Sequence, residues 1–117
     1  MEMEGLAVNI QLKKGVLELC VLSLLQAQDR YGYELVKTIS ENVAISEGTI
    51  YPLLRRLQND GYVATYVIES QEGPPRKYYR LSPSGQQTLL QLIREWNGLV
   101  RGVTNILTRE QEVEQHD

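Results

Sequence analysis

The chain has 117 residues, of which 42% are hydrophobic and 23% charged, an ordinary composition for one water-soluble domain with a modest core. No apolar run is long enough to span a bilayer, and the N-terminus carries acids where a secretory signal would carry bases. We therefore expect a cytoplasmic protein with no membrane partner. The single cysteine, Cys20, excludes an intrachain disulfide, and its Leu/Val-rich surroundings predict a buried structural thiol.

The net charge of −3 argues weakly against nucleic-acid binding, but the charges are unevenly distributed. Six of the 15 acids lie near the two ends, whereas all 12 bases lie between Lys13 and Arg109. Without those six acids the chain has 12 bases and 9 acids, a net charge of +3. Because phosphate binding depends on the local field, a DNA-binding surface remains compatible with this composition.

Two helices are expected in the first third of the chain. The first is predicted from about residue 11 to residue 26, with no clear element before it, and its wide apolar stripe suits burial in the core and against a second chain. A turn over residues 29–32 leads to a second helix that ends near Glu41. Its inward residues are Tyr31, Leu35, Val36 and Ile39. Tyr33 and Lys37 face outward, and Lys37 is a candidate phosphate contact because such a helix crosses the DNA backbone.

A third helix is predicted to begin at Ser46, a good N-cap residue. Four apolar residues are spaced so that they fall on one face of this helix, and they are Ile50, Leu53, Leu54 and Leu57. Gly48 and Arg55 point away from that face. Pro52 has no amide hydrogen, so the helix is expected either to begin later or to bend there. Gly61 is expected to end the helix in a left-handed conformation.

A β-hairpin follows directly. The β-forming residues between Tyr62 and Ile68 predict one strand, and residues 76–81 predict a second that begins with cations. The segment Glu69–Pro75 is expected to break the pairing, which makes a basic, proline-containing tip. A lone hairpin is most simply a solvated surface feature. Behind a helix with outward arginines it favours a DNA-binding wing, with the helix in the major groove and the tip at phosphates or the minor groove.

A long helix is predicted at the C-terminus, capped by Ser82 or Ser84, with Pro83 in its first turn if Ser82 is the cap. Its apolar positions follow a heptad seam of the kind that joins two chains, and they are Leu89, Ile93, Trp96, Val100, Val103 and Leu107. The alternative is that this stripe only covers the domain core. From Glu110 onward the chain is polar and is expected to fray.

The predicted fold class is mainly α, with an α+β arrangement: a winged helix-turn-helix with a long C-terminal dimerisation helix. The winged domain with its N-terminal helix is expected over residues 1–81. The dimerisation helix is expected over residues 82–109, and a polar tail over residues 110–117.

Three segments resemble the PadR family of bacterial transcriptional regulators: YGYEL at 31–35, SEGTIYPLLRRLQNDGYV at 46–63 and GPPRKYYRLSPSG at 73–85. The single long C-terminal helix with a Trp is similar to the small branch of that family, which includes multidrug-sensing repressors. The resemblance implies a homodimeric repressor that binds a pseudo-palindromic operator. It maps the recognition positions onto Ser46, Gly48, Thr49, Tyr51 and Arg55, and the wing onto residues 73–77.

The resemblance also implies that Trp96 stacks on a planar aromatic or hydrophobic effector at the dimer interface, which makes Trp96 the candidate ligand-binding residue. Pro74 stands where family members often have a base, a departure that weighs against deep entry of the wing into the minor groove. The candidate DNA-binding residues are Lys37, Ser46, Gly48, Thr49, Tyr51, Arg55, Arg56, Gly73, Arg76 and Lys77. The expected partners are duplex operator DNA, a second copy of the chain and that effector, and no cofactor or metal is expected.

Two other classes of function fit the sequence less well. An enzyme is disfavoured because the only histidine, His116, is near the C-terminus, Cys20 looks buried, and no metal-ligand spacing or phosphate-binding glycine loop is present. A winged helix that binds proteins and no DNA stays open, because the total charge is acidic and the hairpin is nearly balanced. The hairpin charges are Glu69 and Glu72 against Arg76, Lys77 and Arg80.

Overall fold

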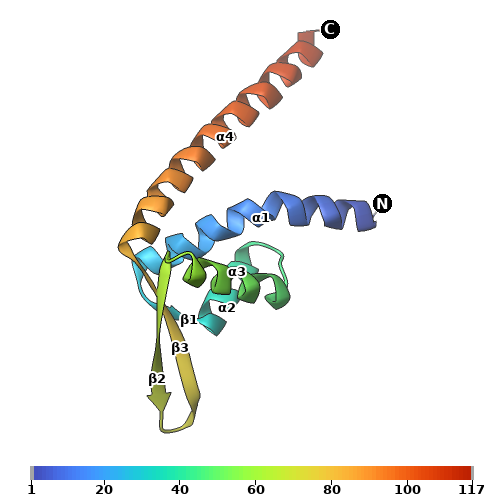
Figure 1. Ribbon diagram of the computed structural model, residues 1–117. Helices are drawn as coiled ribbons and strands as arrows, with labels where there is room; N and C mark the ends of the chain where they lie inside the picture. Colours follow the sequence, from blue (N-terminus) through green and yellow to red (C-terminus); the bar gives the residue numbers. More distant parts are fainter. Residues whose placement is uncertain (1, 117) are drawn as a thin grey trace.

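The structure is a computed structural model that describes the backbone of residues 2–116 and the side chains of residues 15–111. His116 and most of the terminal acids therefore lie outside the described side chains. The described chain comprises four helices and a three-stranded antiparallel sheet, whose long hairpin projects away from the helices (Figure 1). The helices are α1 (Glu2–Ala27), α2 (Gly32–Asn42), α3 (Glu47–Asn59) and α4 (Pro83–His116). The strands are β1 (Arg30–Tyr31), β2 (Val63–Ser70) and β3 (Gly73–Leu81).

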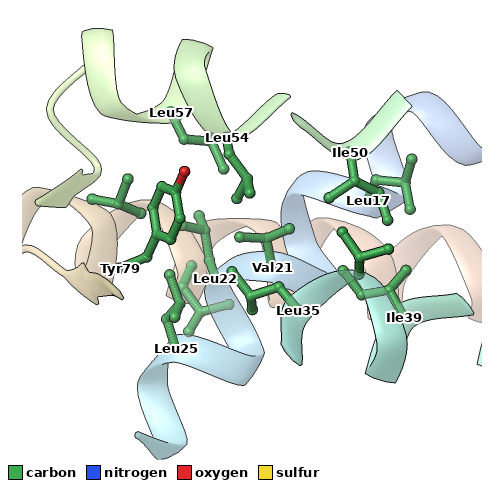
Figure 2. Packing of buried hydrophobic residues seen from close by; sticks show 13 residues of the cluster. Leu17, Val21, Leu22, Leu25, Leu35, Ile39, Ile50, Leu54, Leu57 and Tyr79 are labelled. Atoms are coloured by element: carbon green, nitrogen blue, oxygen red, sulfur yellow. The ribbon is translucent and has the colours of Figure 1, made fainter. Parts of the chain in front are cut away.

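The buried core lies between α1, α2 and α3 and is closed by the base of the hairpin. Figure 2 shows Tyr79 reaching in from β3 among the side chains of α1 and α3. The core residues are Leu17, Val21, Leu22, Leu25, Leu35, Val36, Ile39, Ile50, Leu54, Leu57, Val63, Tyr79 and Leu89. The inward faces predicted for α2 and α3 are confirmed by this set, except that Tyr31 and Leu53 are only half-buried.

Two predictions near the N-terminus are wrong. α1 begins at Glu2 and not near residue 11, because the first ten residues are mostly good helix formers even though they show no clear apolar period. The expected turn over residues 29–32 contains β1, in which Arg30 pairs with Tyr79 and Tyr31 with Tyr78. Those partners lie almost 50 residues away in the sequence, so no local pattern could reveal the pairing.

α3 runs unbroken through Pro52, so the expectation of a later start is wrong. Ser46 is the N-cap with an extended backbone, but its side chain makes no capping hydrogen bond. Its hydroxyl instead shares a 3.2 Å hydrogen bond with the hydroxyl of Thr49. At the other end Gly61 has φ of 80°, which confirms the left-handed residue predicted to terminate the helix.

The hairpin is longer than predicted, because β3 includes both Pro74 and Pro75. Proline cannot donate a ladder hydrogen bond and is confined in sheets to edges and bulges. The pairing of the two strands is irregular between Ile68 and Ser70, directly opposite the prolines, and this irregularity accommodates them. The turn is therefore Gln71–Glu72 alone, and the expected loop over 69–75 is wrong.

α4 begins at Pro83 and is capped by Ser82, whose hydroxyl oxygen accepts a 3.0 Å hydrogen bond from the amide of Gly85. It continues to His116, seven residues beyond the end predicted at residue 109. The molecule measures 68 × 34 × 22 Å with a radius of gyration of 17.8 Å. A compact chain of this length would have about 13 Å, and the excess arises because α4 projects from the domain (Figure 1). Within the described residues, no helix is both long and apolar enough to cross a bilayer.

Candidate nucleic-acid interface

The outward face of α3 is polar and open at its start. Ser46, Gly48, Thr49, Tyr51 and Arg55 are all exposed, while the apolar face of the same helix is buried in the core. A Cβ atom added at Gly48 would meet only the Ser46 hydroxyl, at 3.9 Å. The backbone at this end of the helix is therefore accessible to a large partner, as a recognition helix requires.

A notch of about 450 Å³ separates α3 from the hairpin. It is lined by Tyr31, Gly32, Tyr33, Tyr51, Arg55, Pro75, Arg76, Lys77 and Tyr79. Arg55, Arg76 and Lys77 are its three bases, no acid is among the described residues that line it, and none of the three takes part in an ion pair within the described side chains. The notch is thus a site of positive potential between two projecting elements, which suits a phosphate backbone.

Tyr51 fits into the notch because Gly32 lacks a side chain. A Cβ atom at Gly32 would lie 3.2 Å from Cε1 of Tyr51, closer than an ordinary contact. The glycine therefore lets the ring of the recognition helix lie against the start of α2. Tyr33 is exposed beside them. Sequence reasoning assigned no DNA contact to Gly32 or Tyr33, although both belong to the YGYEL segment that carried the family resemblance.

The bases of the wing are held by aromatic rings. Tyr31, Tyr78 and Tyr66 form a row across the three strands, with ring centroids 5.6 Å and 5.5 Å apart. The guanidinium carbon of Arg76 lies 4.6 Å from the centroid of Tyr31, and that of Arg80 lies 5.2 Å from the centroid of Tyr66. Cation–π contacts of this kind restrict arginine side chains that would otherwise lose more conformational entropy on binding DNA.

The tip of the wing differs from the basic tip predicted. Gln71 and Glu72 form the turn, with the amide of Glu72 donating a 3.2 Å hydrogen bond to the Ser70 hydroxyl. The bases begin further back, at Arg76 in β3. Lys77 donates a 3.4 Å hydrogen bond to Gln58 of α3, so it lies on the side of the hairpin that faces the recognition helix. The positive charge of the hairpin therefore lies along β3, behind the turn, and the prediction of a basic tip is wrong.

Arg56 is engaged within the molecule. Its guanidinium lies 3.1 Å from a carboxylate oxygen of Glu18 on α1 and 3.3 Å from one of Asp60. The hydrogen bond to Glu18 is the main reason that the pKa of Arg56 is raised above its ordinary value. Arg56 thus joins the C-terminal end of α3 to α1 and does not line the notch, so its predicted DNA contact has a competing structural role.

Lys37 is exposed on α2 beside the start of α3. It lines a second hollow of about 450 Å³ together with Ser46, but Glu41 and Glu47 line the same hollow. Gly73, the remaining predicted wing residue, is exposed at the first position of β3. The structure therefore gathers Tyr51, Arg55, Arg76 and Lys77 at one notch. Lys37 and Ser46 line the second hollow instead, and Gly73 lines neither.

The seam predicted on α4 divides into two parts. Leu89 is fully buried in the domain core and Ile93 packs against that core, so Leu89 cannot reach a second chain. The large apolar side chains further along are exposed: 41% for Trp96 and 62% for Leu99, for example. The others are Val100, Val103, Ile106 and Leu107. Exposed apolar rows of this length on a soluble domain mark an interaction surface.

Cys20 is only half-buried on α1, less than the buried thiol that was predicted, and this partial burial raises the pKa of the thiol. It faces a mostly apolar hollow of about 270 Å³ between α1 and α2. Among the described residues, no three histidine, cysteine or acidic side chains are grouped so that they could hold a metal ion. Neither feature adds chemistry to the notch.

Two helices joined by a short turn, followed by a two-stranded wing and with bases on the second helix and the wing, define a winged helix-turn-helix DNA-binding domain. The Transcriptional regulator PadR-like family matches residues 21–91, more than half of the chain, so this chain belongs to the PadR-like family of transcriptional regulators. Regulators of this family bind DNA and are not enzymes, which confirms the predicted class.

Solved structures agree with this assignment. A PadR family transcriptional regulator from Eggerthella lenta is 34% identical with a TM-score of 0.78, covering 91% of this chain and 94% of that one. A PadR-like transcriptional regulator from Bacillus cereus is 36% identical with a TM-score of 0.75, covering 83% and 96%. PadR of Bacillus subtilis, solved in complex with operator DNA, is 26% identical with a TM-score of 0.62, covering 67% and 45%. The predicted mainly helical winged fold is thereby confirmed.

Proposed function

We propose that the protein is a cytoplasmic homodimeric repressor that binds a pseudo-palindromic operator through α3 and the wing of each protomer. The observation that carries the proposal is the notch between α3 and β3, where three bases converge without an acid among the described residues that line it. Supporting it, a structural relative was solved with operator DNA bound. In a symmetric dimer the two recognition helices lie about one DNA turn apart, roughly 34 Å.

The test is binding to the duplex upstream of the protein's own gene, measured by fluorescence anisotropy at several salt concentrations. Affinity falls steeply with salt, because each neutralised phosphate contributes about −0.9 to the logarithmic slope. Arg55→Ala and Arg76→Ala lower the affinity, whereas Arg101→Ala, an equal change of charge on exposed α4, leaves it unchanged. If neither notch variant changes binding, the protein is better explained as a winged helix that contacts other proteins.

Dimerisation is assigned to the exposed row on α4 that begins at Trp96. Six large apolar side chains there face solvent, in a helix that projects from the domain. The heptad spacing of Trp96, Val100, Val103 and Leu107 suits knobs-into-holes packing with a second helix. Sedimentation of Val103→Glu should show a monomer, while Asn105→Glu, on the opposite side of the same helix, should remain a dimer. A dimeric Val103→Glu protein would reject this surface.

A planar hydrophobic effector is proposed to bind at Trp96, which is 41% exposed on the same surface. Indole rings stack well on flat aromatic ligands. Such a ligand releases DNA only if it binds the DNA-incompetent state more tightly, since equal affinity shifts nothing. Titration of planar aromatic cations should quench Trp96 fluorescence and lower operator affinity together. A flat titration across such compounds removes the effector from the proposal without affecting DNA binding.

A further inference from the structure

The first turn of α4 is hydrogen-bonded to the turn that ends α3. The hydroxyls of Ser82 and Ser84 both donate to the carbonyl oxygen of Gly61, over 2.6 Å and 2.8 Å. The amide of Ser82 donates to the carbonyl oxygen of Tyr62 over 3.1 Å. The same Ser82 hydroxyl caps α4 by accepting from the amide of Gly85. The Ser82 hydroxyl therefore hydrogen-bonds both to the first turn of α4 and to the turn that ends α3.

Gly85 brings the two backbones into direct contact. It is buried, and a Cβ atom built there would lie 2.0 Å from the carbonyl oxygen of Tyr62 and 2.8 Å from Cδ1 of Leu81. The nearest atom is main chain, so no side-chain rotation can relieve the clash. Any larger residue at position 85 must move α4 away from Tyr62.

The turn on the other side of this contact is itself fixed to α3. Gly61, with φ of 80°, donates its amide to the carbonyl of Gln58 over 3.1 Å, and the amide of Tyr62 donates to Leu57 over 2.9 Å. These bonds close the end of α3 in the manner of a Schellman cap. One turn beyond Gly85, Leu89 anchors α4 in the core. The orientation of α4 relative to α3 is thus set at two points, without a flexible linker.

We propose that Ser82, Ser84 and Gly85 are positioning residues that fix the angle between α4 and the recognition helix, and thereby the half-site spacing that the dimer accepts. This inference rests on the proposed function. If two protomers are joined through α4 near Val100, that point is 15 residues, or about 22 Å, from Gly85. A tilt of about 10° at the junction then moves each domain by about 4 Å, close to the rise of one base pair, 3.4 Å.

The experiment measures affinity for a series of duplexes in which the spacer between the two operator half-sites is changed from −2 to +2 base pairs. The proteins are the unaltered chain, Gly85→Ala, the double variant Ser82→Ala/Ser84→Ala, and Gln87→Ala as an exposed control on the same helix. Circular dichroism and sedimentation establish that each variant is folded and dimeric. A defect in stability alone lowers affinity for every spacer equally, whereas a change of angle moves the optimum.

Gly85→Ala should shift the preferred spacer by one or two base pairs. The double serine variant should reduce the ratio between the best and next-best spacer by about threefold to tenfold, the effect of losing one or two neutral hydrogen bonds. Gln87→Ala should match the unaltered protein. A folded, dimeric Gly85→Ala protein that keeps the original preferred spacer overturns the inference. If that variant does not fold, the inference is overturned by a double serine variant whose ratio between the best and next-best spacer is unchanged. Absence of any spacer preference in the unaltered protein instead overturns the proposed dimeric operator binding, and the inference with it.

Discussion

The hydroxyl of Tyr66 donates a 2.7 Å hydrogen bond to Oδ2 of Asp29, which ties the wing to the segment that follows α1. Nε of Arg80 donates to the same oxygen over 3.1 Å, and its guanidinium stacks on the Tyr66 ring. One carboxylate thus joins β2 and β3 to the body of the domain. Since the bases of the wing lie along β3, the position of the hairpin determines where they meet DNA.

Asp29→Asn should therefore weaken operator binding by about threefold to tenfold without unfolding the domain, because it loosens the wing. Tyr66→Phe removes one of the two hydrogen bonds and should have a smaller effect in the same direction. Anisotropy measures both, and Gln26→Ala, exposed at the end of α1, is the control. Equal affinity in all four proteins would mean that the wing is held by the strand pairing alone.

The hydrogen bond to Asp29 also raises the pKa of Tyr66 above its usual value of about 10. A raised pKa in the folded state means that this bond contributes stability below pH 10, and that the contribution is lost as the pH rises through the folded pKa. Absorbance titration of tyrosinate should show two residues ionising late in the unaltered protein: Tyr66, and Tyr79, whose pKa is raised by burial. In Asp29→Asn only Tyr66 should ionise earlier, and an unchanged titration would contradict the assignment.

Arg55 and Arg56 are neighbours with different expected roles. Arg55→Ala should lower operator affinity about tenfold or more, because its side chain lines the notch. Arg56→Ala should change affinity less than threefold, since Arg56 pairs with Glu18 and Asp60. It should cost about 1 kcal/mol of stability, because the Arg56 guanidinium is half-exposed to solvent. Denaturant unfolding and anisotropy on the two variants separate these effects. The reverse order of affinities would place the DNA on the α1 side of the recognition helix.

Much of this fold could be predicted from local patterns. The apolar period of α3 and the glycine at position 61 identified the recognition helix and its end, and Ser82 was one of two predicted caps for α4. These features depend on neighbours within one or two turns. The clearest failures, β1 and the prolines inside β3, depend on strand pairing between distant segments. A pairing of that kind leaves no signal in a window of a few residues.

The candidate site also has features that local spacing predicts and features that depend on distant residues. Helical spacing was sufficient to place Tyr51 and Arg55 on the outward face. It could not show that Arg56 meets Glu18, 38 residues earlier, or that Gly32 makes room for Tyr51. Leu89 was assigned to the dimer seam because its heptad spacing fits. The same spacing, however, is found both where a helix packs on the core of its own chain and where it packs on a second chain. Only the position of α1 against α4 distinguishes them.

Leu89 and Leu99 should therefore respond differently to truncation. Leu89→Ala leaves a cavity in the core and should lower the free energy of unfolding by about 2–5 kcal/mol. If α4 joins two chains as proposed, Leu99→Ala removes an interface side chain, and the resulting loss of stability should depend on protein concentration. Urea unfolding at two concentrations measures this, with Asn105→Ala as control. A concentration-independent loss in Leu99→Ala would assign that residue to the fold of one chain.

Glu69 and Glu72 place negative charge at the tip, while Arg76 and Lys77 lie behind it on β3. If the tip approaches the duplex, Glu72→Lys replaces repulsion by a phosphate contact, so affinity should rise and the logarithmic salt slope should steepen by about 0.9. Glu95→Lys, the same charge change on exposed α4, should alter neither quantity to that extent. An equal response in both variants would indicate only a change in net charge, with the tip distant from DNA and binding confined to the notch.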